Sequence, residues 1–549
     1  MPDKNFVLVL HSHIPYVLSH GSWPHGVDWL FEAAAESYLP LLGVLQRLAD
    51  EGIPPRVSVG ITPVLAAQLK DPRFRDGFDG YLAMKIESAL KDRAYFERTG
   101  EAELAALAAF WQEWYEKLAL DFHGTWHDEI VAGFRALQDA GQIEVLTSAA
   151  THGYFPLLSR DASLRLQVRQ GKHSYRSHFG RDAKGFWIPE CAYRPAYVWK
   201  PPFGDRTAYP RQGVDEILGS EGIGYFFVDG HLLRGGTARG VYTDRFPALK
   251  RLWEGSRSSA ERLEDPARDP YSPYLAYPSD TPFFVRDAVS GTQVWSRQAG
   301  YPGDGWYLEF HKKHFPGGMR YWRITSAEAS LGDKLPYEPV RTRERLEDQA
   351  RHFVSTIEGL LEGRDGGTVV SLYDTELLGH WWFEGPEWLY LVLKGLARSS
   401  VPPATASAAL EARPPRTAVS LPEGSWGEGG FHGIWLNVDT AWIWEMIYRI
   451  EDDAECLGDG KDTDPRLFRQ FLREKLLLES SDWPFLISTW SARDYAENRA
   501  AGHYERAKTL AGWLRTGRPL APGEESLLQS WEQEDAIFKE VVTPDGRVL

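Results

Sequence analysis

The stretch FVLVLHSHIPYVLSHGSWPHG, Phe6 to Gly26, opens with a short apolar run that leads directly into His11-Ser12-His13. An uninterrupted apolar run of this length is typical of a strand buried on both faces of a parallel sheet. Two histidines spaced i, i+2 on an extended chain point to the same side. Such a pair suits a zinc ion, and it suits hydrogen bonding to a polar substrate equally well, so the remainder of the chain must decide between them.

Composition narrows the class of protein. A chain of 549 residues is too long for one ordinary domain, and a net charge of −16 disfavours nucleic acid and anionic membranes as partners. The chain has no apolar run long enough to span a membrane, and its N-terminus lacks the pattern of a secretory signal. Cys191 and Cys456 are too few for a disulfide framework. We therefore expect a cytoplasmic protein.

Outward from Phe6, apolar strands alternate with helical segments, which indicates parallel β/α units. The chain shows about seven such strands before residue 380, among them residues 6–10, 56–62, 143–149, 185–188, 225–228 and 368–373. Residues 72–141 read as a helical insertion and residues 229–277 as a long loop. We expect a catalytic domain over residues 1–398, a Pro-, Ala- and Ser-rich linker over 399–422, and an all-helical domain over 423–549.

Two carboxylates directly follow strands. Glu190 ends the segment GFWIPE, and Asp374 ends the segment TVVSLYD. In parallel β/α folds the residues just beyond the carboxyl ends of the strands form the active site. Two carboxylates facing each other are the minimum set for glycosidic bond chemistry. The alternative is structural, with Glu190 paired to Arg194 and both acids capping helices.

Aromatic residues and a third histidine surround these acids. The chain has 22 tryptophans, several of them beside the polar motifs, and tryptophan faces suit the apolar faces of sugar rings. His152, in THGYFPLL, follows another strand and is expected on the same rim as His11 and His13. Three histidines suit a zinc site, but their aromatic and proline neighbours favour a sugar-binding wall.

Taken in order, the motifs HSHIPYV, THGYFP, FWIPECAY and LYDTELLGHWW resemble those of glycoside hydrolase family 57. The segments WPHGVDWLFEAAAESYLPLL, VWSRQAGYPGDGWYLEFH, SWGEGGFHGIWLN and SSDWPFLIS resemble the 1,4-α-glucan branching enzymes of that family. The resemblance covers most of residues 5–500. It implies an α/β fold, a distorted (β/α)7 barrel with a helical insertion and an all-helical C-terminal domain.

The resemblance also implies roles for particular residues. Glu190 falls on the nucleophile and Asp374 on the proton donor of a retaining double displacement that needs no metal and no cofactor. The implied partner is a linear α-1,4-glucan, whose cut segment is transferred to a 6-hydroxyl. The implied substrate contacts are His11, His13, Trp29, His152, Tyr242 on a mobile flap, Arg286, Trp295, Gly303, His380, Trp426, Trp435 and Asp482.

At one place the chain departs from the family pattern. Where the family often reads TTGQ after SSDWPFLI, this chain reads STWS, which puts Ser491 at the place of the glutamine. The amide contact is therefore missing or replaced by stacking on Trp490. This change bears on the choice of acceptor and on the balance between transfer and hydrolysis.

Three rival functions follow from the same residues. An α-amylase or a 4-α-glucanotransferase would use the same two carboxylates. A zinc-dependent carbohydrate deacetylase or a mannosidase-like enzyme would use His11 and His13. A glucan-binding protein without activity would not need both Glu190 and Asp374.

Overall fold

The computed structural model describes residues 3–203, 206–234, 268–296 and 300–549. Its centre is a sheet of strands in the order β10-β1-β2-β3-β4-β7-β9-β8-β11, and the first seven of these are parallel. The strands are β1 (Lys4–Ser12), β2 (Ser58–Ile61), β3 (Glu144–Ser148), β4 (Gly185–Trp187), β7 (Tyr225–Val228), β8 (Tyr274–Ala276), β9 (Thr281–Val285), β10 (Gly367–Asp374) and β11 (Ala418–Val419). A separate hairpin joins β5 (Tyr197–Trp199) to β6 (Tyr209–Arg211).

The sheet curls into a distorted barrel, which confirms the expected fold. Just beyond β9, the backbone N–H of Asp287 donates to the carbonyl of Val370 on β10 at 2.8 Å, so the chain leaving one side of the parallel sheet meets the other side. The seven parallel strands agree in number with the strands expected from the sequence. Strand β9 carries Pro282 within only five residues, which is why no apolar pattern singled it out.

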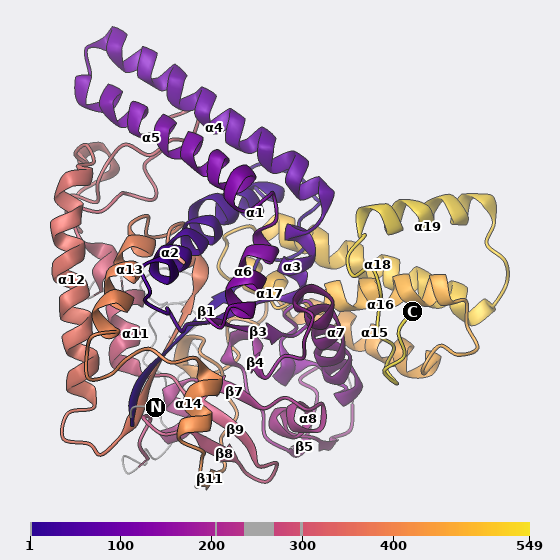
Figure 1. The fold of residues 1–549 in the computed structure, drawn as a ribbon. Helices are drawn as coiled ribbons and strands as arrows, with labels where there is room; N and C mark the ends of the chain where they lie inside the picture. The colour runs from indigo at the N-terminus through magenta and orange to yellow at the C-terminus, as the bar shows by residue number, and fades with distance from the viewer. Residues whose placement is uncertain (1–2, 204–205, 235–267, 297–299) are drawn as a thin grey trace.

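Strand β1 lies between β10 and β2 and is buried from Phe6 to Ser12. Helices cover the outside of the sheet (Figure 1). They are α1 (Val27–Ala33), α2 (Leu39–Asp50), α3 (Pro63–Leu69), α6 (Ile130–Asp139), α7 (Asp161–Phe179), α8 (Val214–Ser220), α9 (Gly230–Arg234), α11 (Ala288–Trp295), α12 (Pro339–Leu360), α13 (Gly385–Leu396) and α14 (Ala406–Ala412). Because β1 is buried on both faces, under helices outside and within the barrel inside, its sequence is a continuous apolar run.

The expected insertion at 72–141 contains two kinds of helix. Helices α4 (Pro72–Thr99) and α5 (Ala102–Leu120) pack against each other and project from the barrel as a long pair (Figure 1). Asp71 caps α4 by accepting a hydrogen bond from the Arg73 N–H at 2.8 Å, and Gly100 ends it in the left-handed conformation. Helix α6 instead packs on β3 and α7, so it belongs to the outer layer of the barrel.

The Pro-, Ala- and Ser-rich range 399–422 is not a free linker. It contains α14 and β11, and β11 pairs with β8. Phe6 of β1 donates its N–H to the carbonyl of Pro402 at 3.0 Å and accepts from the N–H of Ala404 at 2.9 Å. Because these backbone bonds tie the segment to the central strand, its composition reflects an irregular path along the sheet and not flexibility.

Beyond this range the expected all-helical domain has α-helices, in the described structure, only between residues 441 and 534, because residues 423–440 and 535–549 consist mainly of turns and irregular segments. The helices are α15 (Ala441–Leu457), α16 (Pro465–Leu478), α17 (Asp482–Ser488), α18 (Arg493–Thr516) and α19 (Pro522–Glu534). Helix α16 packs on α18, which also contacts α15 and α17. The helices join the barrel where Ser480 pairs with Gly153 in an isolated bridge and where the Ser481 N–H donates to the carbonyl of His152 at 3.0 Å. Among the residues that the structure describes, no helix is both long enough and apolar enough to cross a membrane.

Gly379, directly before His380, is expected to be indispensable to the fold. Its φ of +111° favours glycine, and a Cβ at this position would collide with the carbonyl oxygen of Glu36. We expect Gly379→Ala to lower the free energy of unfolding by about 3 kcal/mol or more. Gly43→Ala is the matched control, because Gly43 lies in α2 with open space around it and should gain up to about 1 kcal/mol. Denaturant unfolding of both variants measures this, and equal effects would contradict it.

Candidate active site

A cavity of about 1220 Å3 lies at the carboxyl ends of the parallel strands. Residues that follow β1, β3, β4 and β10 reach it, together with residues from the C-terminal helices. Its lining includes most of the side chains expected from the sequence, namely His11, His13, Trp29, His152, Glu190, Trp295, Asp374, His380, Trp426, Asp482 and Ser491. The shared strand direction therefore gathers residues more than 350 positions apart into one site.

Glu190 is held at a sharp turn directly after β4. The turn Pro189–Cys191 puts Glu190 at φ 58°, a left-handed conformation that is costly for a side chain with a Cβ. Trp426 donates its Nε1–H to Glu190 Oε2 at 2.8 Å, and its backbone N–H donates to the Glu190 carbonyl at 3.0 Å. Ser481 donates its hydroxyl to Oε1 at 3.3 Å. Each carboxylate oxygen of Glu190 thus has one donor.

Asp374 is the last residue of β10 and stands opposite His11 in the register of β1 with β10. It lines the same cavity as Glu190, and the two carboxylates lie close enough for the charge of one to act on the other. Burial raises the pKa of Glu190 to about 8, and the negative charges of Asp374 and Asp482 add to this against the hydrogen bond from Trp426. The charge of Asp374 therefore adds to the effect of burial on Glu190.

A third carboxyl, Glu376, lines the same cavity. Burial raises the pKa of Glu376 to about 7, although it accepts hydrogen bonds from the Tyr38 hydroxyl and from the His13 N–H, the latter at 3.0 Å. Sequence analysis assigned no role to Glu376. The sequence feature that indicates it is the motif YDTE, in which Glu376 follows Asp374 by two residues. The tight turn there places both acids at the end of one strand.

The histidines form a stacked group beside Glu190. His11 packs on Trp187 with ring centroids 4.5 Å apart, and His13 packs on His152 at 4.0 Å. Burial lowers the pKa of both His11 and His152 well below the ordinary value, and neighbouring histidines lower it further. Both rings are therefore neutral near pH 7 and offer one donor and one acceptor each.

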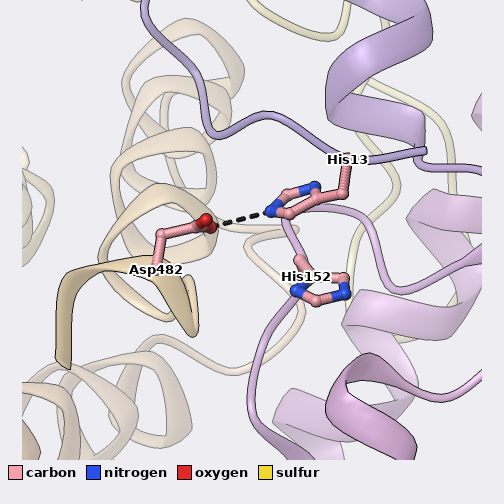
Figure 2. A group of neighbouring side chains, drawn as sticks. All are labelled: His13, His152 and Asp482. Carbon is pink, nitrogen blue, oxygen red and sulfur yellow. Dashed lines mark hydrogen bonds and ion pairs between the residues drawn. The ribbon is translucent and has the colours of Figure 1, made fainter. Parts of the chain in front are cut away.

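Figure 2 shows the three side chains of this region that present metal-binding atoms together, His13, His152 and Asp482. Their ligand atoms lie within 4.8 Å of one another. His13 Nε2 meets Asp482 Oδ2 at 2.8 Å and its Nδ1 meets Thr62 Oγ1 at 3.1 Å. His152 also has a partner at each ring nitrogen, so a metal ion here would have to displace existing hydrogen bonds.

Aromatic side chains form much of the cavity wall. Besides Trp29, Trp295 and Trp426, the lining includes Trp23, Phe310, Phe315 and Trp381, which sequence analysis did not single out. Trp23 and Phe315 are 74% and 67% exposed, although both are large and apolar. Each precedes a proline in an otherwise polar loop. A large aromatic residue in such a loop is the sequence feature from which a place in a binding surface could have been predicted.

Three of the expected contacts lie outside the lining of this cavity. Trp435 is 1% exposed and packs on Tyr154 with ring centroids 4.4 Å apart, so it is a core residue behind the cavity. Gly303 lines a separate depression of about 450 Å3. Arg286 forms an ion pair with Asp229 at 3.1 Å, and its guanidinium lies 5.6 Å from the ring centre of Trp426, so it supports the wall from behind. Tyr242 falls outside the described residues.

Glu190 is expected to reduce stability at high pH. The folded pKa of about 8 exceeds the ordinary value of 4.5, so the folded protein binds the proton more tightly and loses stability as the pH rises from 4.5 to 8. Glu190→Gln removes this loss. Relative to wild type, its free energy of unfolding should rise across that window by on the order of 5 kcal/mol. Denaturant unfolding at pH 5 and pH 9 tests this, and a difference independent of pH would refute it.

Comparisons with known proteins agree with this arrangement. The family model of glycosyl hydrolase family 57 matches residues 7–322, and that of the 1,4-alpha-glucan branching enzyme C-terminal region matches residues 443–544. The 1,4-alpha-glucan branching enzyme TK1436 of Thermococcus kodakarensis is 40% identical over 544 residues, covering 97% of this chain and 77% of the relative.

Solved structures give the same result. The crystal structure of TK1436 superposes with a TM-score of 0.87 at 39% identity, covering 98% of this chain and 96% of that one. The GH57-type branching enzyme of Pyrococcus horikoshii matches with a TM-score of 0.87 at 37% identity and the same coverage of both chains. The alpha-amylase AmyC of Thermotoga maritima matches with a TM-score of 0.78 at 28% identity, covering 99% and 98%. On these matches and on the barrel and carboxylate pair described above, the chain belongs to glycosyl hydrolase family 57.

Proposed function

We propose that the protein is a 1,4-α-glucan branching enzyme, which cuts an α-1,4 bond in a linear glucan and joins the released segment to a 6-hydroxyl. The observation that carries this proposal is the pair Glu190 and Asp374, which face one aromatic-lined cavity from the ends of β4 and β10. The names of the relatives point to the same activity, and the second family model is that of branching-enzyme C-terminal regions.

In the first half of the reaction, a carboxylate oxygen of Glu190 forms a bond to the anomeric carbon. The bond from that carbon to the leaving O4 breaks, and Asp374 gives its proton to O4. In the second half, Asp374 takes the proton of the acceptor 6-hydroxyl, whose oxygen attacks the anomeric carbon and releases the Glu190 carboxylate. Two inversions restore the α configuration.

The mechanism sets a requirement on protonation. Before attack, Glu190 must be ionised and Asp374 protonated. Burial raises the pKa of Glu190, so in the free enzyme Glu190 tends to hold a proton that it must lose before it can attack. The N–H of Trp426 opposes this rise by stabilising the ionised form of Glu190. Trp426 is therefore proposed to set the pH at which the nucleophile becomes active.

The same cavity offers ways to bind the sugar chain. The indole and phenyl faces provide stacking surfaces, and the imidazole rings of His11, His13 and His152 line the cavity beside them. Ser491 lines the cavity, whereas its neighbour Trp490 is 63% exposed beneath the Arg493 guanidinium, 4.5 Å from the ring centre. If Trp490 stacks on a sugar ring, that ring therefore belongs to the part of the bound chain that lies outside the cavity.

The decisive experiment is a linkage assay on amylose. New α-1,6 branches, lost in Glu190→Gln and in Asp374→Asn, would support the proposal. Reducing sugar without branches would instead favour an α-amylase, the second candidate, which the match to AmyC supports. Loss of activity on chelation, recovered with zinc, would favour the metal-dependent alternative at His13, His152 and Asp482.

Trp426→Phe should move the pH profile. The change keeps an aromatic ring but removes the N–H that stabilises the Glu190 carboxylate. For wild type we expect kcat/KM to rise with pH up to about 8, the pKa of Glu190 in the free enzyme. In the variant this rising part of the pH profile, its acid limb, should move to higher pH by roughly one unit. Trp29→Phe is the control, because Trp29 lines the cavity and should change KM without moving the limb. An unmoved limb in Trp426→Phe would contradict the role.

A further inference from the structure

We propose that Ser481 is a positioning residue that holds the Glu190 carboxylate and fixes the tautomers of His152 and His11 through one directed chain of hydrogen bonds. This inference rests on the proposed function, in which Glu190 is the nucleophile. Ser481 lies in the C-terminal helical region, outside the strands of the barrel, and is 1% exposed.

The chain has four members. His11 Nε2 lies 3.0 Å from His152 Nε2, His152 Nδ1 lies 2.8 Å from Ser481 Oγ, and Ser481 Oγ lies 3.3 Å from Glu190 Oε1. The direct separation between His152 Nδ1 and Glu190 Oε1 is 3.8 Å, too long for a hydrogen bond. Ser481 therefore bridges the histidine pair and the carboxylate.

The direction of the chain follows from the chemistry of its ends. An ionised carboxylate can only accept, so Ser481 must give its one proton to Glu190. The hydroxyl oxygen then accepts from His152 Nδ1–H, which leaves His152 Nε2 bare. That atom accepts in turn from His11 Nε2–H, so His11 Nδ1 carries no proton.

The last atom of the chain fits this assignment. His11 Nδ1 is buried and makes no hydrogen bond to any residue that the structure describes. The nearby Gly60 would place a Cβ only 3.5 Å from it. This buried atom stays without a partner among the described residues in either direction, so it does not oppose the assignment. The direction of the chain therefore rests on the ionised Glu190 carboxylate, which can only accept.

Backbone contacts hold Ser481 in place independently of its hydroxyl. Its N–H donates to the carbonyl of His152 at 3.0 Å, and the preceding Ser480 bridges to Gly153. Ser481 is also the N-cap residue of α17, a position where serine side chains usually bond to the helix backbone. Here its side chain makes no such capping bond within the described structure, since its hydroxyl faces His152 and Glu190.

The test compares Ser481→Ala and Ser481→Thr with the control Ser488→Ala. Ser488 is in the same helix and equally buried, but its hydroxyl donates to the carbonyl of Ile434 at 2.6 Å, away from Glu190. We expect Ser481→Ala to lower kcat about tenfold, to change KM for amylose less than twofold, and to move the acid limb of kcat/KM to higher pH. Threonine should restore both, and Ser488→Ala should change neither.

A second comparison tests the chain itself. His11→Phe keeps a ring on Trp187 but cannot donate to His152. If His11 and Ser481 act through one chain, Ser481→Ala should cost much less in the His11→Phe background than the tenfold seen in wild type. Equal costs in both backgrounds would overturn the chain.

The remaining outcomes are also decisive. The proposal fails if Ser481→Ala keeps more than half of the wild-type kcat with an unmoved acid limb. It fails equally if kcat falls while the acid limb does not move and Ser481→Thr does not restore kcat, because a purely structural role of Ser481 would give that result. The proposed function fails separately, when wild type forms no α-1,6 linkages on amylose. In that case the pH profile can still be measured on the hydrolysis of amylose, and it still tests the contact between Ser481 and Glu190.

Discussion

Parallel pairing of β1 with β10 and β2 is the constraint on which the rest of the molecule depends. It buries β1 on both faces and sets the register that places His11 opposite Asp374. Since side chains alternate along a strand, a slip of one residue would turn both of these side chains away from the cavity. The register of one buried strand therefore determines whether the site exists.

The site brings carboxylates and neutral histidines together, and burial explains how these groups are protonated. Glu190, Asp374 and Asp482 face one cavity, and burial makes the charged form of Glu190 unfavourable there. His11 and His152 cannot compensate with positive charge, because burial keeps them neutral. Directed N–H and O–H groups stabilise the carboxylate instead, and such fixed dipoles need little reorganisation when charge moves during a reaction.

The barrel alone does not complete this site. Trp426, Ser481 and Asp482 all follow the last strand of the parallel sheet, yet they contact Glu190 or His13 directly. The helical region is thus part of the site and not an appended module. The same holds for the range 399–422, whose backbone is bonded to β1.

The alternation of strands and helices, the helical C-terminal region, the two acids at strand ends and the histidines beside them could be predicted from the chain alone. These features are local, since burial pattern and strand-end position can be read along the chain. Resemblance to family 57 motifs added the roles of Glu190 and Asp374 and the set of expected substrate contacts. Most of these side chains do line one cavity, but Trp435, Gly303 and Arg286 do not.

Which side chains act together depends on contacts that form only in the folded chain. The bridge from His152 through Ser481 to Glu190 joins residues that are about 300 positions apart, and no pattern along the chain records that distance. The raised pKa of Glu190 likewise depends on burial by segments from the whole molecule. Strand periodicity is set by neighbours in sequence, whereas proton placement and hydrogen-bond direction are set by neighbours in space, which only the folded chain supplies.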